Sequence, residues 1–342
     1  MKIGVLTGGG DSSAINDGIR AIVIDVKDRG GEIVGIRCGW KGLIEGDIMP
    51  LDVCHVEDIA NTGGTLICTS RTNPFKIEGA LDRIRENIKK IGLEGLIAFG
   101  GNDTLTVASK LAKEGLKVIG IPQTIDNDIF GTEYCVGFLS ALRNIVAATN
   151  MAISSNKSHQ IEMIVEVMGR DSGWLAVNSA LAIGADMVII PEFEVRLDDI
   201  CSLIKRNRAR GKMHSLIIVS EAIKVSGAKG LYNEIDNFGN IKFGGIAFAL
   251  ADEINKAISV KPRVVVLGYL QRGGMPAEQD VINSVMMSAA AVDAIYAGNF
   301  DKMVVFNNGR IQLVPLEAAS EGISTVNREL YDLANRLGSR AC

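Results

Sequence analysis

Short apolar runs alternate along this chain with longer stretches in which apolar residues recur every three or four positions. The runs at 2–7, 96–99 and 118–121 are bounded by glycine or proline, which is typical of buried strands in a parallel sheet. Residues 14–29, after the first run, instead carry apolar residues at helical spacing. Strands that alternate with helices in this way favour a doubly wound α/β fold.

The same alternation continues along the rest of the chain. Five glycines (Gly227, Gly230, Gly239, Gly244 and Gly245) predict a loop region late in the sequence. Further strands are expected at 32–37, 162–167, 187–190, 215–219 and 264–267, and further helices at 81–91, 104–114, 174–182, 197–208 and 246–258.

Composition limits the possible partners of the protein. A chain of 342 residues has room for one large or two ordinary domains, and 47% apolar residues supply a substantial core. The net charge of −4, from 36 basic and 40 acidic residues, argues against a nucleic-acid partner. No apolar run has the length of a membrane span and the start has no signal-peptide layout, so no membrane partner is expected. Six cysteines without a CxxC pair predict reduced thiols in a cytoplasmic protein.

Small and acidic residues follow three of the expected strands directly. They form the segments 8–11, 100–104 and 122–128, which read GGGD, GGNDT and PQTIDND. In open α/β sheets, ligands bind just past the carboxyl ends of the strands. Glycine lets the backbone approach an anion, and aspartate offers hard oxygen ligands to Mg²⁺. These segments therefore predict a site for a phosphate and its metal ion.

Together with other motifs in the same order, these segments resemble the phosphofructokinase family. The resemblance extends from residue 2 to about residue 320. The motifs are GVLTGGGD at 4–11 with Asn16 and Arg20, GGT at 63–65, SRTNP at 70–74, GGNDT at 100–104, PQTIDND at 122–128, EVMGR at 166–170, Ser220-Glu221, Arg263 and GYLQRGG at 268–274.

The resemblance implies two Rossmann-like three-layer domains with mainly parallel sheets. Residues 1–137 plus about 271–310 would bind the phosphoryl donor. Residues 138–270 plus about 311–342 would bind the sugar phosphate. The interfaces shared by the family imply a homodimer or homotetramer, and its substrates imply a sugar phosphate with pyrophosphate or ATP.

The resemblance also implies the chemistry, which is transfer of a phosphoryl group to the 1-hydroxyl of fructose 6-phosphate with Mg²⁺. Asp126 would take the proton from that hydroxyl, Thr124 would orient it, and Asp128 would help to position metal and substrate. Arg71 and Arg170 would stabilise the transferred charge, since arginine suits bidentate contacts with phosphate.

Further residues are carried over from the motifs by position. The implied metal ligands are Asp103 and Asp128. The implied donor-binding residues are Gly9, Gly10, Asp11, Arg71, Gly101, Asn102, Asp103, Thr104 and Gln123. The implied acceptor-binding residues are Thr124, Asp126, Asp128, Met168, Gly169, Arg170, Glu221, Arg263, Tyr269 and Arg272.

Three departures from the family pattern concern the donor. Asn102 stands where the family usually has an acid, and an amide is a weaker, neutral metal ligand. Asp103 replaces the glycine of typical ATP users, and a carboxylate there would repel an α-phosphate, so it marks pyrophosphate users. Gln123 stands where those users have lysine, so the two donor markers disagree. The exclusion by Asp103 favours pyrophosphate, and ATP remains the alternative.

A fourth departure concerns the acceptor. Ile161 replaces an arginine that family members donate across a subunit interface to the 6-phosphate, and Tyr269 replaces a common histidine. A lost charge-assisted contact costs about 1.5–3 kcal/mol. A kinase of the same family that acts on a different sugar or sugar phosphate is therefore an alternative.

Two alternative functions do not include kinase activity. A regulatory paralogue with weakened catalysis is suggested by Asn102, Gln123 and Ile161, although the implied base and both arginines are retained. A nucleotide-dependent dehydrogenase is less favoured because the first glycine turn lacks the G-x-G-x-x-G spacing.

Overall fold

The chain folds into two compact units, which we describe from a computed structural model. The structure describes residues 1–228, 234–235, 241–242 and 245–340. The first unit comprises Met1–Ala141 and Arg272–Ser324, and the second comprises Leu142–Gln271 and Thr325–Cys342. The chain therefore passes between the units three times, once within the long helix α6 (Phe138–His159).

A seven-stranded sheet forms the centre of the first unit. Its order is β15-β14-β5-β4-β1-β2-β3, and the five inner strands run parallel to one another. The two edge strands β15 and β3 are antiparallel to their neighbours. The strands are β1 (Lys2–Gly8), β2 (Glu32–Ile36), β3 (Ile48–Leu51), β4 (Gly95–Gly100), β5 (Val118–Pro122), β14 (Lys302–Asn307) and β15 (Arg310–Pro315).

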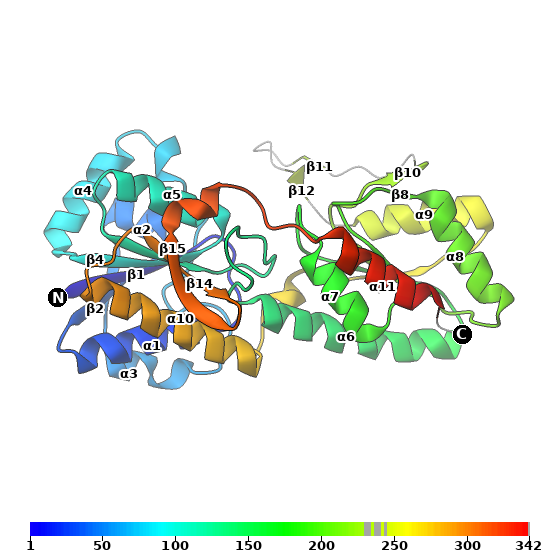
Figure 1. Cartoon of the computed structure of the whole chain (residues 1–342), viewed down its shortest axis with the longest axis horizontal. Helices are drawn as coiled ribbons and strands as arrows, with labels where there is room; N and C mark the ends of the chain where they lie inside the picture. The colour runs from blue at the N-terminus through cyan, green and yellow to red at the C-terminus, as the bar shows by residue number, and fades with distance from the viewer. Residues whose placement is uncertain (229–233, 236–240, 243–244, 341–342) are drawn as a thin grey trace. The chain divides into compact units, whose positions relative to one another are not determined.

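Helices cover both faces of this sheet (Figure 1). One hydrophobic core joins the sheet to α1 and α10, and a second joins its other face to α2, α4 and α5. These helices are α1 (Ile15–Asp28), α2 (Trp40–Glu45), α3 (Val53–Val56), α4 (Ala80–Ile91), α5 (Asn102–Lys113) and α10 (Glu278–Tyr296), with 3₁₀ turns at Glu57–Ile59, Pro74–Lys76 and Leu316–Ser320.

The second unit is built around a parallel four-stranded sheet of order β13-β6-β9-β7. Helices α8 and α9 share a hydrophobic core with this sheet, while α7 and α11 pack against β7. The elements are β6 (Met163–Val167), β7 (Met187–Ile189), β9 (Leu216–Ser220), β13 (Arg263–Val266), α7 (Trp174–Ile183), α8 (Leu197–Ala209), α9 (Ile246–Ile258) and α11 (Arg328–Arg340), the 3₁₀ turn Gly268–Gln271, and the two-residue strands β8 (Val195–Arg196), β10 (Val225–Ser226), β11 (Glu234–Ile235) and β12 (Ile241–Lys242).

The observed elements agree closely with the strand and helix ranges expected from periodicity. The predicted helix at 246–258 has the same bounds as α9, and the predicted two-domain α/β fold is confirmed. The loop expected around Gly230, Gly239 and Gly244 lies outside the described residues. Along the chain, none of the helices in the described ranges has the length and apolarity needed to cross a membrane.

The last passage between the units lies later than the sequence indicated. The expected boundary near residue 310 falls at the start of β15, whereas the compact units divide after Ser324. The reason is that β15 pairs along its full length with β14, and the 3₁₀ turn Leu316–Ser320 then packs against α5. These contacts keep residues 310–324 in the first unit.

Thr104 fixes the start of α5 against the ends of the two central strands. Gly8 and Gly100 are paired at the ends of β1 and β4. A Cβ on Gly8 would lie 2.6 Å from Thr104 Oγ1, and one on Gly100 would lie 2.4 Å from Thr104 Cβ. Both positions therefore have to be glycine for Thr104 to be buried between the strands.

We expect Gly8→Ala to destabilise the first unit by about 1–3 kcal/mol, because the added methyl overpacks this contact. The loss should shrink in a Thr104→Ala background, which removes the two atoms nearest to the new Cβ. Urea unfolding of the two single variants and the double variant measures the coupling between the sites.

The matched control is Gly322→Ala, because a Cβ on Gly322 meets nothing within 4 Å. Equal effects at the two glycines, or purely additive effects of Gly8→Ala and Thr104→Ala, would contradict the contact.

Candidate functional site

The glycine turn after β1 is joined to the loop that carries Arg71. Gly9 adopts φ 89°, a left-handed conformation that favours glycine. Its N–H donates to the Ser70 carbonyl at 3.0 Å, and its carbonyl accepts from Thr69 Oγ1 at 2.9 Å. Arg71, the next residue in this loop, is exposed. The turn and the arginine predicted to bind the donor thus belong to one hydrogen-bonded assembly.

The amino terminus of α5 lies beside this turn at the same edge of the sheet. Gly101 is extended, and Asn102 and Asp103 form the first turn of the helix. The free N–H groups and the dipole of a helix amino terminus favour bound anions. Asp103 is exposed, whereas Asn102 is half-buried and donates from Nδ2 to Asp128 Oδ2 at 3.0 Å. The predicted donor segment and the acidic segment after β5 therefore meet.

Gln123 connects the end of β5 to the glycine turn. It is buried, and its Nε2 donates to the Gly10 carbonyl at 3.1 Å and to Ser12 Oγ at 2.9 Å. Its Oε1 makes no hydrogen bond within the described part of the chain. The amide of Gln123 thus supports the backbone of the turn, a role that the sequence analysis did not foresee.

Asp126, the predicted base, lies on a tightly held loop after β5. It is only 5% exposed, and its N–H donates to Thr124 Oγ1 at 3.2 Å. The next residue, Asn127, has φ 53°. Both the oxygen and the nitrogen of its side-chain amide make hydrogen bonds that hold the loop. Its Oδ1 accepts from the Cys135 N–H at 2.8 Å, and its Nδ2 donates to the Glu133 carbonyl at 3.1 Å. The backbone that carries the Asp126 carboxylate is thereby held in a defined position.

Asp280 anchors the segment that follows this loop, and the sequence analysis missed it. Its carboxylate accepts from the Gly137 N–H and the Ser140 N–H, both at 2.9 Å, from Ser140 Oγ at 2.5 Å and from the Tyr134 hydroxyl. Burial raises the pKa of Asp280, against the opposing effect of these hydrogen bonds. Asp280 follows the Gly-Gly-x-Pro segment at 273–276 by four residues and carries no local signal of its own, and its partners are more than a hundred residues away.

Arg272 lies in the first unit, beside the turn predicted to bind the donor. It is 7% exposed, and its Nη1 donates to the Asp11 carbonyl at 3.0 Å. A Cβ on Gly10 would lie 2.6 Å from the same nitrogen, so glycine at this position makes room for the guanidinium. The resemblance had placed Arg272 among the acceptor-binding residues, whereas its contacts are with the donor turn.

In the second unit, the segment after β6 meets the end of β9. The Glu221 N–H donates to the Val167 carbonyl at 3.0 Å, and Glu221 Oε1 accepts from the Arg170 N–H at 3.1 Å. Gly169 and Arg170 have φ 138° and 48°, so the backbone turns sharply here and leaves the Arg170 side chain exposed. The Met168 N–H donates to Gln271 Oε1 at 3.1 Å. Four predicted acceptor residues, Met168, Gly169, Arg170 and Glu221, are thus brought together.

The structure does not bring Arg263 to this group. Arg263 begins β13 and pairs in parallel with Met163, the first residue of β6. It therefore lies at the amino end of the sheet, opposite the carboxyl end where Arg170 and Glu221 meet. Tyr269, on the 3₁₀ turn after β13, is 81% exposed.

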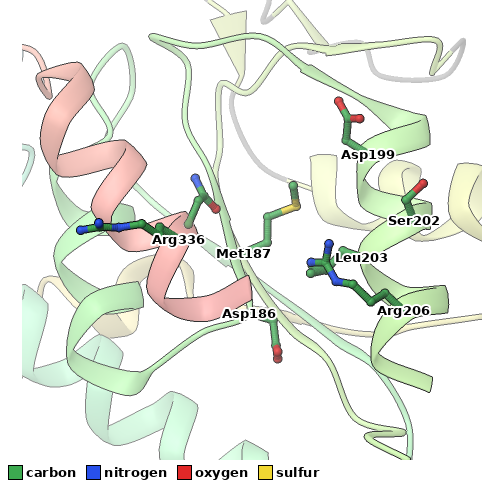
Figure 2. Close-up of a pocket in the computed structure, with 8 residues that line it drawn as sticks. Asp186, Met187, Asp199, Ser202, Leu203, Arg206 and Arg336 are labelled. Atoms are coloured by element: carbon green, nitrogen blue, oxygen red, sulfur yellow. The ribbon is translucent and has the colours of Figure 1, made fainter. Parts of the chain in front are cut away.

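The residues predicted to form the site neither form a metal-binding cluster in the described ranges nor line the pocket in Figure 2. No group of three or more His, Cys, Asp or Glu side chains in the described ranges is arranged to hold a metal ion. The pocket of about 430 Å³ lies in the second unit between α8 and α11, where Arg206 extends toward Met187 and Arg336 extends away from it (Figure 2). It contains no predicted site residue, so the candidate residues are those at the carboxyl edge of each unit's own sheet.

Comparison with known proteins assigns the chain to a family. A family model described as Phosphofructokinase matches residues 2–295. The pyrophosphate–fructose 6-phosphate 1-phosphotransferase of Dictyoglomus thermophilum is 43% identical over 93% of this chain and 92% of its own. The ATP-dependent 6-phosphofructokinase of Mycobacterium leprae is 40% identical over 97% of this chain and 98% of its own. A crystal structure of pyrophosphate-dependent phosphofructokinase from Nitrosospira multiformis has the same fold, with a TM-score of 0.83. The match covers 99% of this chain and 91% of that chain, and the two sequences are 21% identical.

We expect Gln123→Met to destabilise the first unit by about 1–3 kcal/mol, because the Gly10 carbonyl and Ser12 Oγ lose their donor. Gln279→Met is the matched control, since the exposed Gln279 donates one hydrogen bond to Asn283. Urea unfolding followed by circular dichroism compares the two. A larger loss at Gln279 than at Gln123 would show that the buried amide does not support the turn.

Proposed function

Because the chain belongs to the phosphofructokinase family, we propose that it transfers a phosphoryl group from pyrophosphate to the 1-hydroxyl of fructose 6-phosphate. The observation that carries this proposal is the position of Asp126. This carboxylate is buried on a braced loop. The same segment contacts the glycine turn through Gln123 and the amino terminus of α5 through Asp128, and both of these features suit phosphate. We assign donor binding to the first unit and acceptor binding to the second.

Phosphoryl transfer depends on positioning and on stabilising charge. Asp126 accepts the proton of the attacking hydroxyl, and Thr124 orients that hydroxyl. Arg71 and Arg170, both exposed, supply the cations for the developing charge, since the planar guanidinium can make two parallel hydrogen bonds to a phosphoryl group. Gly10 and the first turn of α5 supply backbone N–H groups to the donor, and the left-handed Gly9 shapes the turn that presents them.

Asp103 supports pyrophosphate as the donor. Its exposed carboxylate lies in the first turn of α5, where it would meet and repel the α-phosphate of a nucleotide. Gln123, which stands where pyrophosphate users have lysine, does not count against pyrophosphate. Its Nε2 donates to the Gly10 carbonyl and Ser12 Oγ, so its amide supports the turn. ATP is the second candidate donor, because relatives of nearly equal identity are named as ATP-dependent enzymes.

The residues present fit a magnesium ion that accompanies the donor. Asn102 Oδ1 is buried without a hydrogen-bond partner in the described chain, and it belongs to a side chain that contacts Asp128. Amide and carboxylate oxygens are ligands of the kind that Mg²⁺ accepts. Asp103 and Asp128 would hold the ion, which would offset phosphate charge when bound.

Met168, Gly169, Arg170 and Glu221 form the acceptor side of the proposal. Glu221 is buried, and a carboxylate in this position suits the hydroxyls of a sugar. Ile161 supplies no charge for a 6-phosphate, which favours weak binding of fructose 6-phosphate or a different sugar phosphate as the second candidate acceptor. Arg263 begins β13 at the other end of the sheet, so it does not belong to this group of residues.

The proposal includes a homo-oligomer in the cytoplasm, a dimer or a tetramer, acting in glycolysis. Closed homo-oligomers are the commonest assemblies of soluble proteins, and members of this family share subunit interfaces. The five cysteines among the described residues are all free thiols, which is typical of a reducing compartment.

We expect Asp126→Asn to lower kcat by about 10²–10⁴-fold, because the amide cannot accept the hydroxyl proton. Asp332→Asn is the control, since Asp332 is exposed on α11 and pairs with Arg328 at 3.4 Å. Steady-state assays with saturating pyrophosphate and fructose 6-phosphate measure the change. Retention of full kcat by Asp126→Asn would remove Asp126 from the role of base.

We expect Asp103→Gly to shift the ratio of kcat/KM for ATP to that for pyrophosphate at least about tenfold toward ATP, because it removes a charge that repels the nucleotide. Asp82→Asn, a change at an exposed acid on α4, is the control. An unchanged ratio would show that Asp103 does not select the donor.

A further inference from the structure

Asn102 and Asp128 form a pair that links the ends of two neighbouring strands. Asn102 follows β4 as the first residue of α5, and Asp128 lies on the loop after β5. The distance from Asn102 Nδ2 to Asp128 Oδ2 is 3.0 Å. An ionised carboxylate only accepts hydrogen bonds, so the amide nitrogen must face Asp128 and the amide oxygen must point elsewhere.

The other end of the amide has no partner. Asn102 Oδ1 is buried from solvent and accepts no hydrogen bond from any described residue. A buried acceptor left unsatisfied costs free energy, so the arrangement is favourable only if something else offsets that cost. The bond from Nδ2 to the Asp128 carboxylate is the interaction that offsets it, since hydrogen bonds to charged groups are stronger than neutral ones.

Asp103 does not take part in this pair. Successive residues on a helix do not face the same direction, and Asp103 is exposed while Asn102 is half-buried. The carboxylate that neighbours Asn102 in sequence thus cannot replace it beside Asp128.

A second carboxylate at residue 102 would lie against Asp128 and repel it, and a divalent cation would relieve that repulsion. The amide relieves it without a cation, because it donates a hydrogen bond. We propose that Asn102 keeps the donor-free site closed to free divalent cations, so that a metal ion enters only together with the charges of the donor. This inference rests on the proposed function, since it assumes a phosphate-bearing donor at this edge.

The test measures metal binding in the absence of donor, with Mn²⁺ as the probe and electron paramagnetic resonance of the free ion as the readout. Asn102→Asp should bind Mn²⁺ about tenfold or more tightly than the wild type, because it completes a pair of carboxylates. Asn299→Asp, which adds the same charge at an exposed position, should bind like the wild type.

Equal Mn²⁺ affinity of Asn102→Asp and the wild type would overturn the inference, as would an equal gain of affinity in Asn299→Asp. If Asn102→Asp does not fold, Asn102→Glu adds the same charge on a longer side chain and must show the same gain. If the wild type turns over pyrophosphate but Asn102→Asp gains no metal affinity, this inference is refuted and the proposed function stands. A wild type inactive with every donor would refute the proposed function, whatever the metal affinities.

Discussion

The burial of Thr104 between Gly8 and Gly100 is the contact on which the candidate site depends. It joins the start of α5 to the ends of β1 and β4, two adjacent central strands of the seven-stranded sheet. The glycine turn that begins at Gly9 and the polar first turn of the helix that begins at Asn102 follow directly from this contact. Since even one extra carbon atom at either strand end would collide with Thr104, the backbone at both positions is fixed by sterics. The groups that suit a phosphate are therefore positioned by packing rather than by charge.

The second feature of the site is that polar side chains support the backbone instead of pointing to a ligand. Gln123 bonds to the glycine turn, Asn127 closes the loop that carries Asp126, and Asp280 holds the segment beyond it. Buried networks of this kind stabilise one conformation when their members are satisfied. A base can work only if its proton donor lies within hydrogen-bond reach, so a braced loop is a physical requirement for the role proposed for Asp126.

The sequence was sufficient for the order of strands and helices because each has a clear periodicity and is bounded by glycine or proline. It also placed the segments 100–104 and 122–128 just past the carboxyl ends of two strands, and the structure shows that they meet through Asn102 and Asp128. It did not show that Arg263 begins β13, at the opposite end of that strand from Tyr269, and the acceptor-binding role of Arg263 stays a prediction. It also could not show the bracing role of Gln123 or Asp280, because their partners are more than a hundred residues distant and depend on side-chain packing.

The central claim is that this chain moves a phosphoryl group from pyrophosphate to the 1-hydroxyl of fructose 6-phosphate. Phosphorus nuclear magnetic resonance of the purified protein with Mg²⁺, fructose 6-phosphate and either pyrophosphate or ATP tests it most directly, because it identifies both the donor consumed and the position phosphorylated. The account predicts that pyrophosphate is consumed and that a new phosphate ester appears at carbon 1. Formation of that ester with ATP and not with pyrophosphate would contradict the donor assignment, and no new ester with either donor would contradict the function itself.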